Sequence, residues 1–209
     1  MKKMLAIAFA LVLAPLSAFA AATDGASNFK EGTHYTTFNQ SPVNGQPTVT
    51  EFFSFYCPHC YTFEKNYVGA IKAGLADGVE FEQYHVDFIG REMGPEMSRA
   101  LAVAQLLKVQ DTIKPAMFSA IHDARRTFTG RNDVRQLFVD NGVSATDFDK
   151  AAESFMVNST MKKWKKAQQD SGIRGVPSLM VNNKYIVDVG SVQSLEELTD
   201  LLNYLAKKG

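Results

Sequence analysis

Cys57 and Cys60 are the only cysteines of this 209-residue chain, and they lie in the stretch FYCPHCYTF with Pro58 and His59 between them. Two thiols at this spacing can form half of a metal site, anchor a haem covalently, close a small structural disulfide or act as a redox couple. The rest of the sequence separates these four possibilities.

Two of the possibilities lack the residues that they require, and a third would stabilise the fold little. A zinc site takes about four ligands, and His34, His85 and His122 do not have the spacing of a helical ligand pair, so we expect no bound metal. Covalent haem attachment requires a histidine directly after the second cysteine, where this chain has Tyr61. A disulfide that closes so small a loop removes little entropy from the unfolded chain. The pattern therefore favours a redox-active Cys57–Cys60 disulfide that works without another cofactor.

The expected position of the two cysteines assigns them different roles. Cys57 stands where a strand ends and a helix begins, so the free N–H groups and the positive end of the helix dipole stabilise its thiolate. His59 can add to this effect, and Pro58 fixes the geometry of the first turn. Cys60 lies one turn later and is the expected resolving thiol. A thiolate that is stabilised in the reduced form makes the disulfide a strong oxidant.

Two further stretches carry candidate site residues. Glu51 lies in an otherwise apolar strand on the face that leads to Cys57, so burial should raise its pKa and let it carry a proton during exchange. An acid at an exposed edge, or one paired with a lysine, is the alternative for Glu51. Val176 and Pro177, in the stretch GVPS, form either a plain turn or, if their peptide bond is cis, a place where an incoming peptide pairs with the backbone. Glu64 is a weaker candidate.

The elements that position these residues follow from hydrophobic periodicity and turn signals. The helix after Pro58 should carry Phe63, Tyr67 and Ile71 inward and end between Gly74 and Gly78. Strand, helix and strand in this order predict a parallel pair. The expected order is a short strand at 33–38, a buried strand at 48–56, the CPHC helix, a strand at 79–88, helices from 90 to about 172, a hairpin through Asn182-Asn183 and a final helix opened by the capping box at 194–197.

Within the helical stretch, one apolar stripe runs through Met117, Phe118, Ile121, Ala124 and Phe128, and later helices are expected at 147–155 and 161–170. The fold class is therefore α/β, with one α/β unit opened to admit helices.

The N-terminus has the three parts of a signal peptide: Lys2 and Lys3, an apolar run at 4–13, and the small-x-small pattern at 18–20. We expect residues 1–20 to be cleaved and the rest to be exported, where thiols meet an oxidising environment. The loss of Lys2 and Lys3 leaves 20 basic residues against 22 acidic ones, which argues against nucleic acid as a partner. The cluster KKWKK at 162–166 is interpreted as the solvated face of a helix.

Taken together, the signal peptide, EFFSFYCPHC, YHVDF, the helical stretch and GVP resemble the DsbA family of periplasmic thiol:disulfide interchange proteins over essentially the whole mature chain. The resemblance implies a thioredoxin fold with an inserted all-helical domain: 21–89 and 173–209 form the thioredoxin-like domain, and 90–172 the helical insertion. It also implies that Val176–Pro177 is a cis-proline motif beside the cysteines, and that Glu51, His59 and Pro177 match functional positions of the family. Gln83 stands where some members carry a basic residue, which implies a different charge coupling around Glu51.

The implied activity is donation of the disulfide to unfolded exported proteins with free cysteines, followed by reoxidation by a quinone-linked membrane partner of the DsbB type. A reductase or isomerase of the same fold is the first alternative. Isomerases commonly work as dimers, and no dimerisation segment precedes the first expected strand, so we expect a monomer. A peptide-binding chaperone with incidental thiols is the more distant alternative, with a groove lined by aromatic side chains such as Phe55, Tyr56, Tyr61 and Phe63.

Overall fold

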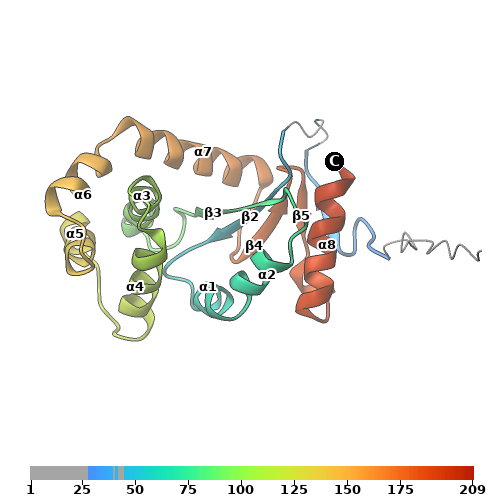
Figure 1. The fold of residues 1–209 in the computed structure, drawn as a ribbon, viewed down its shortest axis with the longest axis horizontal. Coiled ribbons are helices and arrows are strands. Elements are labelled where there is room, and N and C mark those ends of the chain that lie inside the picture. Colours follow the sequence, from blue (N-terminus) through green and yellow to red (C-terminus); the bar gives the residue numbers. More distant parts are fainter. Residues whose placement is uncertain (1–27, 40, 42–44) are drawn as a thin grey trace, which may run out of the picture.

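A five-stranded mixed sheet organises the computed structural model, which describes residues 28–39, 41 and 45–209 (Figure 1). The expected signal peptide at 1–20 lies outside the described residues. The strands are β1 (Tyr35–Thr37), β2 (Thr48–Phe53), β3 (Glu80–His85), β4 (Ser178–Val181) and β5 (Tyr185–Val187). Their order in the sheet is β1-β5-β4-β2-β3, so β2, which leads to Cys57, lies between β4 and β3.

The two strand pairings predicted from the sequence are confirmed. β2 pairs in parallel with β3, and the chain between them forms α1 (Pro58–Phe63), η1 (Glu64–Val68) and α2 (Gly69–Gly74). β4 and β5 form an antiparallel hairpin, and Asn182 and Asn183 at its turn have φ angles of 55° and 50°. Asparagine tolerates this left-handed region better than most residues, which is why the hairpin turns there.

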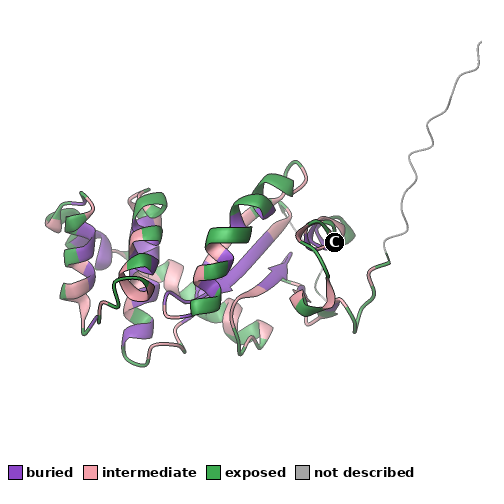
Figure 2. Ribbon diagram, turned by 90° about the horizontal axis from the view of Figure 1, so that it is seen from below, coloured by how far each residue is buried: buried purple, intermediate pink, exposed green. Residues whose placement is uncertain are grey.

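The C-terminal helix α8 (Leu195–Lys208) covers the side of the sheet on which α2 also lies (Figure 1). Ser194 caps it by accepting the backbone N–H of Glu197, as the capping-box pattern predicts. Its leucines pack with Val49 of β2 and Leu179 of β4 into one apolar cluster. The central strand β2 is consequently almost entirely buried (Figure 2).

Five helices are inserted between β3 and β4, at the left of Figure 1. They are α3 (Met93–Leu106), α4 (Gln110–His122), α5 (Arg131–Asp140), α6 (Ala145–Ala152) and α7 (Phe155–Ser171). The long α7 leads back to the sheet, where Trp164 stacks on Tyr84 of β3 with ring centroids 5.8 Å apart. The four lysines of KKWKK are exposed around the buried Trp164, which confirms the solvated helix face.

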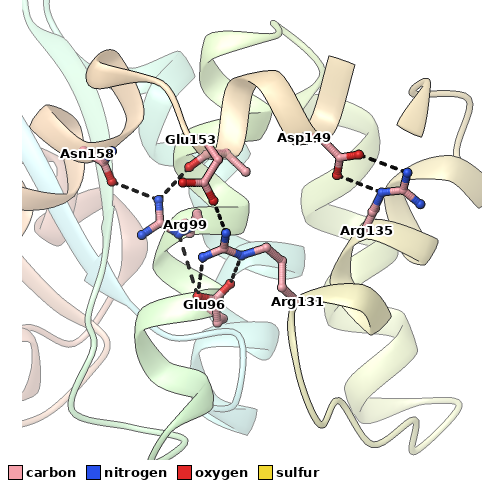
Figure 3. Close-up of polar contacts among 8 residues, drawn as sticks. Glu96, Arg99, Arg131, Arg135, Asp149, Glu153 and Asn158 are labelled. Atoms are coloured by element: carbon pink, nitrogen blue, oxygen red, sulfur yellow. Dashed lines mark hydrogen bonds and ion pairs between the residues drawn. The ribbon is translucent and has the colours of Figure 1, made fainter. Parts of the chain in front are cut away.

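Ion pairs connect α5 to α3 and to α6 within this insertion (Figure 3). Arg131, at the start of α5, contacts both carboxylate oxygens of Glu96 on α3 at 3.0 Å and also pairs with Glu153 after α6. Arg135 pairs with Asp149 on α6 at 2.8 Å. These contacts link α5 to α3 and to α6, but because the paired side chains are partly exposed, they contribute little beside the apolar packing of the inserted helices.

Several predicted boundaries were wrong for local reasons. β2 ends at Phe53 rather than at 56, because Ser54 accepts the N–H groups of Tyr56 through its hydroxyl and of Cys57 through its carbonyl and so starts a turn. The helices expected at 147–155 and 161–170 are α6 and α7, divided at Ser154, whose hydroxyl caps α7 by accepting from Val157 N–H.

The apolar stripe expected through Phe128 is also interrupted. α4 ends at His122, so Ala124 is exposed and Phe128 is buried from a loop rather than from a helix. A buried aromatic at helical spacing beyond a helix end satisfies the periodicity without belonging to the helix.

The inward face predicted for the CPHC helix is wrong at one position. Phe63 and Ile71 are buried as expected, but Tyr67 is 41% exposed and Val68 takes the inward place. The cause is η1, a π-helical turn at Glu64–Val68, which adds one residue to the turn and moves the next inward position from 67 to 68.

Candidate functional site

Cys57 lies at the start of α1, where the strand-to-helix transition was expected. It is the N-cap of the helix, and its Sγ accepts the backbone N–H of Cys60 at 3.2 Å. Its thiol lies 3.5 Å from the carbonyl oxygen of Val176, to which it donates. A sulfur in this position faces the unpaired N–H groups of the first turn, which is an arrangement that stabilises a thiolate.

Cys60 is the shielded member of the pair, as predicted. It is 0% exposed, whereas Cys57 is 8% exposed at the surface. Burial raises the pKa of the Cys60 thiol well above its ordinary value, and its hydrogen bond with Cys57 and the charge of Glu51 act in the same direction. Cys57 is therefore the sulfur that a second molecule can reach, and Cys60 is held as a protonated thiol beneath it. Both cysteines are free thiols in this structure.

The other predicted site residues lie around the pair in different ways. Pro58 and His59 occupy the first turn of α1 and are exposed. The Val176–Pro177 peptide bond is cis, as the family resemblance implies, and Val176 is the residue whose carbonyl contacts Cys57.

Two histidines bind the backbone of Phe55, two residues before Cys57. The backbone N–H of Phe55 donates to Nε2 of His85 at 3.0 Å, and its carbonyl accepts from Nε2 of His122 at 2.8 Å. Because Nε2 accepts this hydrogen bond, the His85 ring is neutral and carries its proton on Nδ1, which donates to Oγ of Ser98 at 2.9 Å. Burial lowers the pKa of His85 to about 3. Neither role was visible in the sequence, where both residues were considered only as metal ligands.

Glu51 belongs to a buried polar network behind the cysteines. It is 1% exposed, and its Oε2 accepts from Nε2 of Gln83 at 2.6 Å. The same Nε2 donates to Glu64 at 2.8 Å, and Lys114 pairs with Glu64 at 2.7 Å and donates to Oε1 of Gln83 at 2.6 Å. Burial raises the pKa of Glu51 to about 8 and the charge of Glu64 adds to the rise, whereas the Gln83 hydrogen bond and the charge of Lys114 act against it.

Lys114 was missed by the sequence reasoning, although a signal was present. With Met117, Phe118 and Ile121 it falls at i, i+3, i+4 and i+7 on α4, so its position belongs to the buried stripe of that helix. A lysine is almost never buried without a partner. A lysine in an apolar stripe therefore indicates a buried anion on a neighbouring element.

In the described part of the chain, no group of three or more His, Cys, Asp or Glu side chains is arranged to hold a metal ion. None of the helices in the same residues has the length and apolar character needed to cross a membrane.

Known proteins match this chain over most of its length. Residues 48–202 match the family described as the DSBA-like thioredoxin domain. The thiol:disulfide interchange protein DsbA of Pectobacterium carotovorum is 40% identical over 88% of this chain and 91% of its own length, and that of Escherichia coli K12 is 35% identical over the same shares.

Solved structures agree with the sequence relatives. DsbA from Proteus mirabilis, in complex with the non-covalently bound peptide PWATCDS, has a TM-score of 0.78 and 37% identity, covering 86% of this chain and 99% of that one. DsbA from Klebsiella pneumoniae has a TM-score of 0.79 at 27% identity, covering 87% of this chain and 100% of that one. Neither alternative function considered from the sequence is favoured by these relatives. With a CPHC pair at a helix start inside a thioredoxin fold that carries inserted helices, the chain belongs to the family of DsbA-like thioredoxin proteins and is a thiol:disulfide oxidoreductase.

Proposed function

We propose that the protein oxidises pairs of thiols in unfolded exported proteins by donating its Cys57–Cys60 disulfide. The observation that carries this direction is the position of Cys57 Sγ at the N-terminus of α1, where it accepts the backbone N–H of Cys60. That hydrogen bond and the helix dipole favour the thiolate of the reduced enzyme, so reduction of the disulfide is favourable.

The exchange runs in two steps. A substrate thiolate attacks Sγ of Cys57, which forms a mixed disulfide, breaks the Cys57–Cys60 bond and leaves Cys60 to take up a proton. A second substrate thiolate then attacks the substrate sulfur of the mixed disulfide and releases Cys57 as a thiolate. Two electrons pass from the substrate dithiol to the cysteine pair, and the substrate leaves with a disulfide bond.

The neighbouring residues have distinct roles in this proposal. Glu51, protonated at neutral pH because of its raised pKa, supplies the proton that Cys60 takes up as it leaves. We assign to His59, which is exposed in the first turn of α1, the role of favouring the thiolate of Cys57, and to Pro58 the role of fixing that turn. The backbone of Val176, next to Pro177, receives the substrate peptide alongside Cys57, to which its carbonyl is already hydrogen bonded. The Proteus mirabilis relative binds a peptide that contains a cysteine, which supports a peptide substrate for this chain.

The cell biology follows from the N-terminal sequence and the relatives. We place the mature protein in the periplasm, after removal of residues 1–20, as a monomer that contains no cofactor besides its disulfide. A membrane oxidase of the DsbB type, linked to quinone, returns the Cys57–Cys60 pair to the disulfide. Within the mature chain, 21–89 and 173–209 form the thioredoxin-like domain and 90–172 the helical insertion.

The direct test mixes oxidised protein with a reduced peptide that carries two cysteines. We expect near-stoichiometric peptide disulfide and reduced enzyme, measured by mass spectrometry after thiol alkylation. Cys57→Ser should be inactive. Cys60→Ser cannot form the enzyme disulfide and should leave the reduced peptide unoxidised, but when it is mixed with a peptide disulfide it should accumulate a mixed disulfide at Cys57, because the thiol that would displace the peptide is missing. A protein that leaves the peptide reduced, or a Cys57→Ser variant that still oxidises it, contradicts the proposal.

A further inference from the structure

Lys114 reaches from the inserted helices to the thioredoxin part of the molecule behind the cysteine pair. It lies on α4 and is 7% exposed. Its Nζ contacts Glu64 Oε1 of η1 at 2.7 Å and Gln83 Oε1 of β3 at 2.6 Å. A buried ammonium group held this closely on two sides is a fixed charge rather than a solvated one.

The side-chain amide of Gln83 connects Lys114 to Glu51 by hydrogen bonds at its two ends. Its carbonyl oxygen accepts from Lys114, and its amide nitrogen donates to Glu51 at 2.6 Å and to Glu64 at 2.8 Å. The amide can be oriented in only one way, because a flip would turn its N–H groups toward the ammonium and its oxygen toward the two carboxylates. Lys114 thus fixes the amide whose other end holds Glu51.

The charges that act on Glu51 come from several elements. Glu64 on η1 opposes ionisation of Glu51, whereas Lys114 on α4 and the exposed Lys72 on α2 favour it. The remaining titratable group is the Cys60 thiol on α1, which the charge of Glu51 itself affects. Among these groups Lys114 is the buried cation, and its contact with Glu64 also offsets the negative charge that opposes ionisation of Glu51.

We propose that Lys114 is a positioning residue for disulfide exchange, because its buried charge, held against Glu64 and Gln83, sets the pH at which Glu51 passes its proton to Cys60. The inserted helices thereby contribute a charge to the chemistry of the thioredoxin part. The inference rests on the proton-carrying role of Glu51 in the proposed function.

The test measures the titration of the Glu51 carboxyl carbon by NMR in the reduced protein, with the Glu51→Gln variant to assign the signal. In Lys114→Met we expect the midpoint to rise by about one pH unit or more, since an opposite charge close to a carboxylate lowers its pKa by about that amount. The matched control is Lys72→Met, which removes the same charge from an exposed position, where water screens it. The control should move the midpoint by less than half as much.

Two further variants separate charge from packing. Glu64→Gln should move the Glu51 midpoint downward, opposite to Lys114→Met, because it removes the like charge. The double variant Gln83→Lys, Lys114→Gln returns the ammonium to the site from β3, between the two carboxylates, and should have a midpoint at or below that of the wild type. If Lys114→Met fails to fold, the downward shift in Glu64→Gln and the midpoint of the double variant test the role of Lys114 without it.

A midpoint that does not move in Lys114→Met, or a double variant whose midpoint is raised despite its restored charge, overturns the inference. The rate of disulfide donation to the two-cysteine peptide, followed against pH, should shift with the NMR midpoint. Because the carboxyl titration is measured independently of peptide oxidation, the role of Lys114 and the proposed oxidase function can be refuted separately. Shifted midpoints without oxidation contradict the proposed function, and oxidation with an unmoved midpoint contradicts the role of Lys114.

Discussion

The carboxyl group of Glu51 is buried, and its burial makes the stability of the fold depend on pH. In the folded protein its pKa is about 8, against an ordinary value of 4.5, and burial is the largest cause. Between these two values the unfolded chain releases the proton and the folded protein keeps it. Glu51 therefore contributes stability that is complete below about pH 4.5 and is lost as the pH rises through 8.

The Glu51→Gln variant should remove this dependence. Its free energy of unfolding should exceed that of the wild type increasingly as the pH rises from 5 to 9, by on the order of a few kcal/mol at the upper end. Urea unfolding of the reduced protein at several pH values measures the difference.

The exposed Glu80 on β3 offers a matched control. The Glu80→Gln variant should follow the wild type at every pH, because no burial penalty is removed. Parallel stability curves for the wild type and Glu51→Gln would show that Glu51 is ionised in the folded protein and would contradict the proton-carrying role.

The sequence identifies the candidate site residues that can be recognised from their local position in a strand or at a helix start. Cys57 and Cys60 follow from a strand-to-helix transition, and Glu51 from an acid in an apolar strand. Lys114 could not be paired with its partners, because the contact joins α4 to β3 and η1 across the fold. Residues that act through such long-range contacts become visible only when the elements are placed.

At the scale of elements, the π-helical turn η1 decides which side of the CPHC helix faces the core. Phe63, Val68 and Ile71 are the inward residues, at steps of five and three rather than two steps of four. The same turn carries Glu64 at its start, where it meets Lys114 and Gln83. A regular helix was the reasonable prediction, because the apolar Tyr67 fitted it and no sequence signal marks the added residue.

Substitution of the two neighbouring residues tests the turn. Val68→Ala should lower the free energy of unfolding by about 2 kcal/mol, because it removes two buried methyl groups and leaves a cavity. Tyr67→Ala should lower it by less than about 1 kcal/mol, since Tyr67 is 41% exposed and packs mainly on the ring of Phe63. Equilibrium urea unfolding measures both. The reverse order of the two losses would indicate a regular helix with Tyr67 inward.

At the scale of the whole molecule, the inserted helices do more than cover the sheet. His122 at the end of α4 binds the carbonyl of Phe55 and stacks on Tyr61 of α1, with ring centroids 5.1 Å apart. Lys114, on the same helix, reaches the network of Glu51. The insertion thus contacts Phe55 and Tyr61, on either side of the cysteine pair in the sequence, and the buried network of Glu51. Periodicity predicted the helices, but not that one of them would hold the site.

The central claim is that the Cys57–Cys60 disulfide is strongly oxidising and is donated to substrate thiols. Equilibration of the protein with glutathione buffers of known ratio, followed by alkylation and mass spectrometry, measures the reduction potential of the pair. We expect a value more oxidising than that of thioredoxin, about −270 mV, by at least about 60 mV, which is a hundredfold in the equilibrium constant. A potential at or below that of thioredoxin would mean that the pair removes disulfides rather than donating them, and would contradict the account.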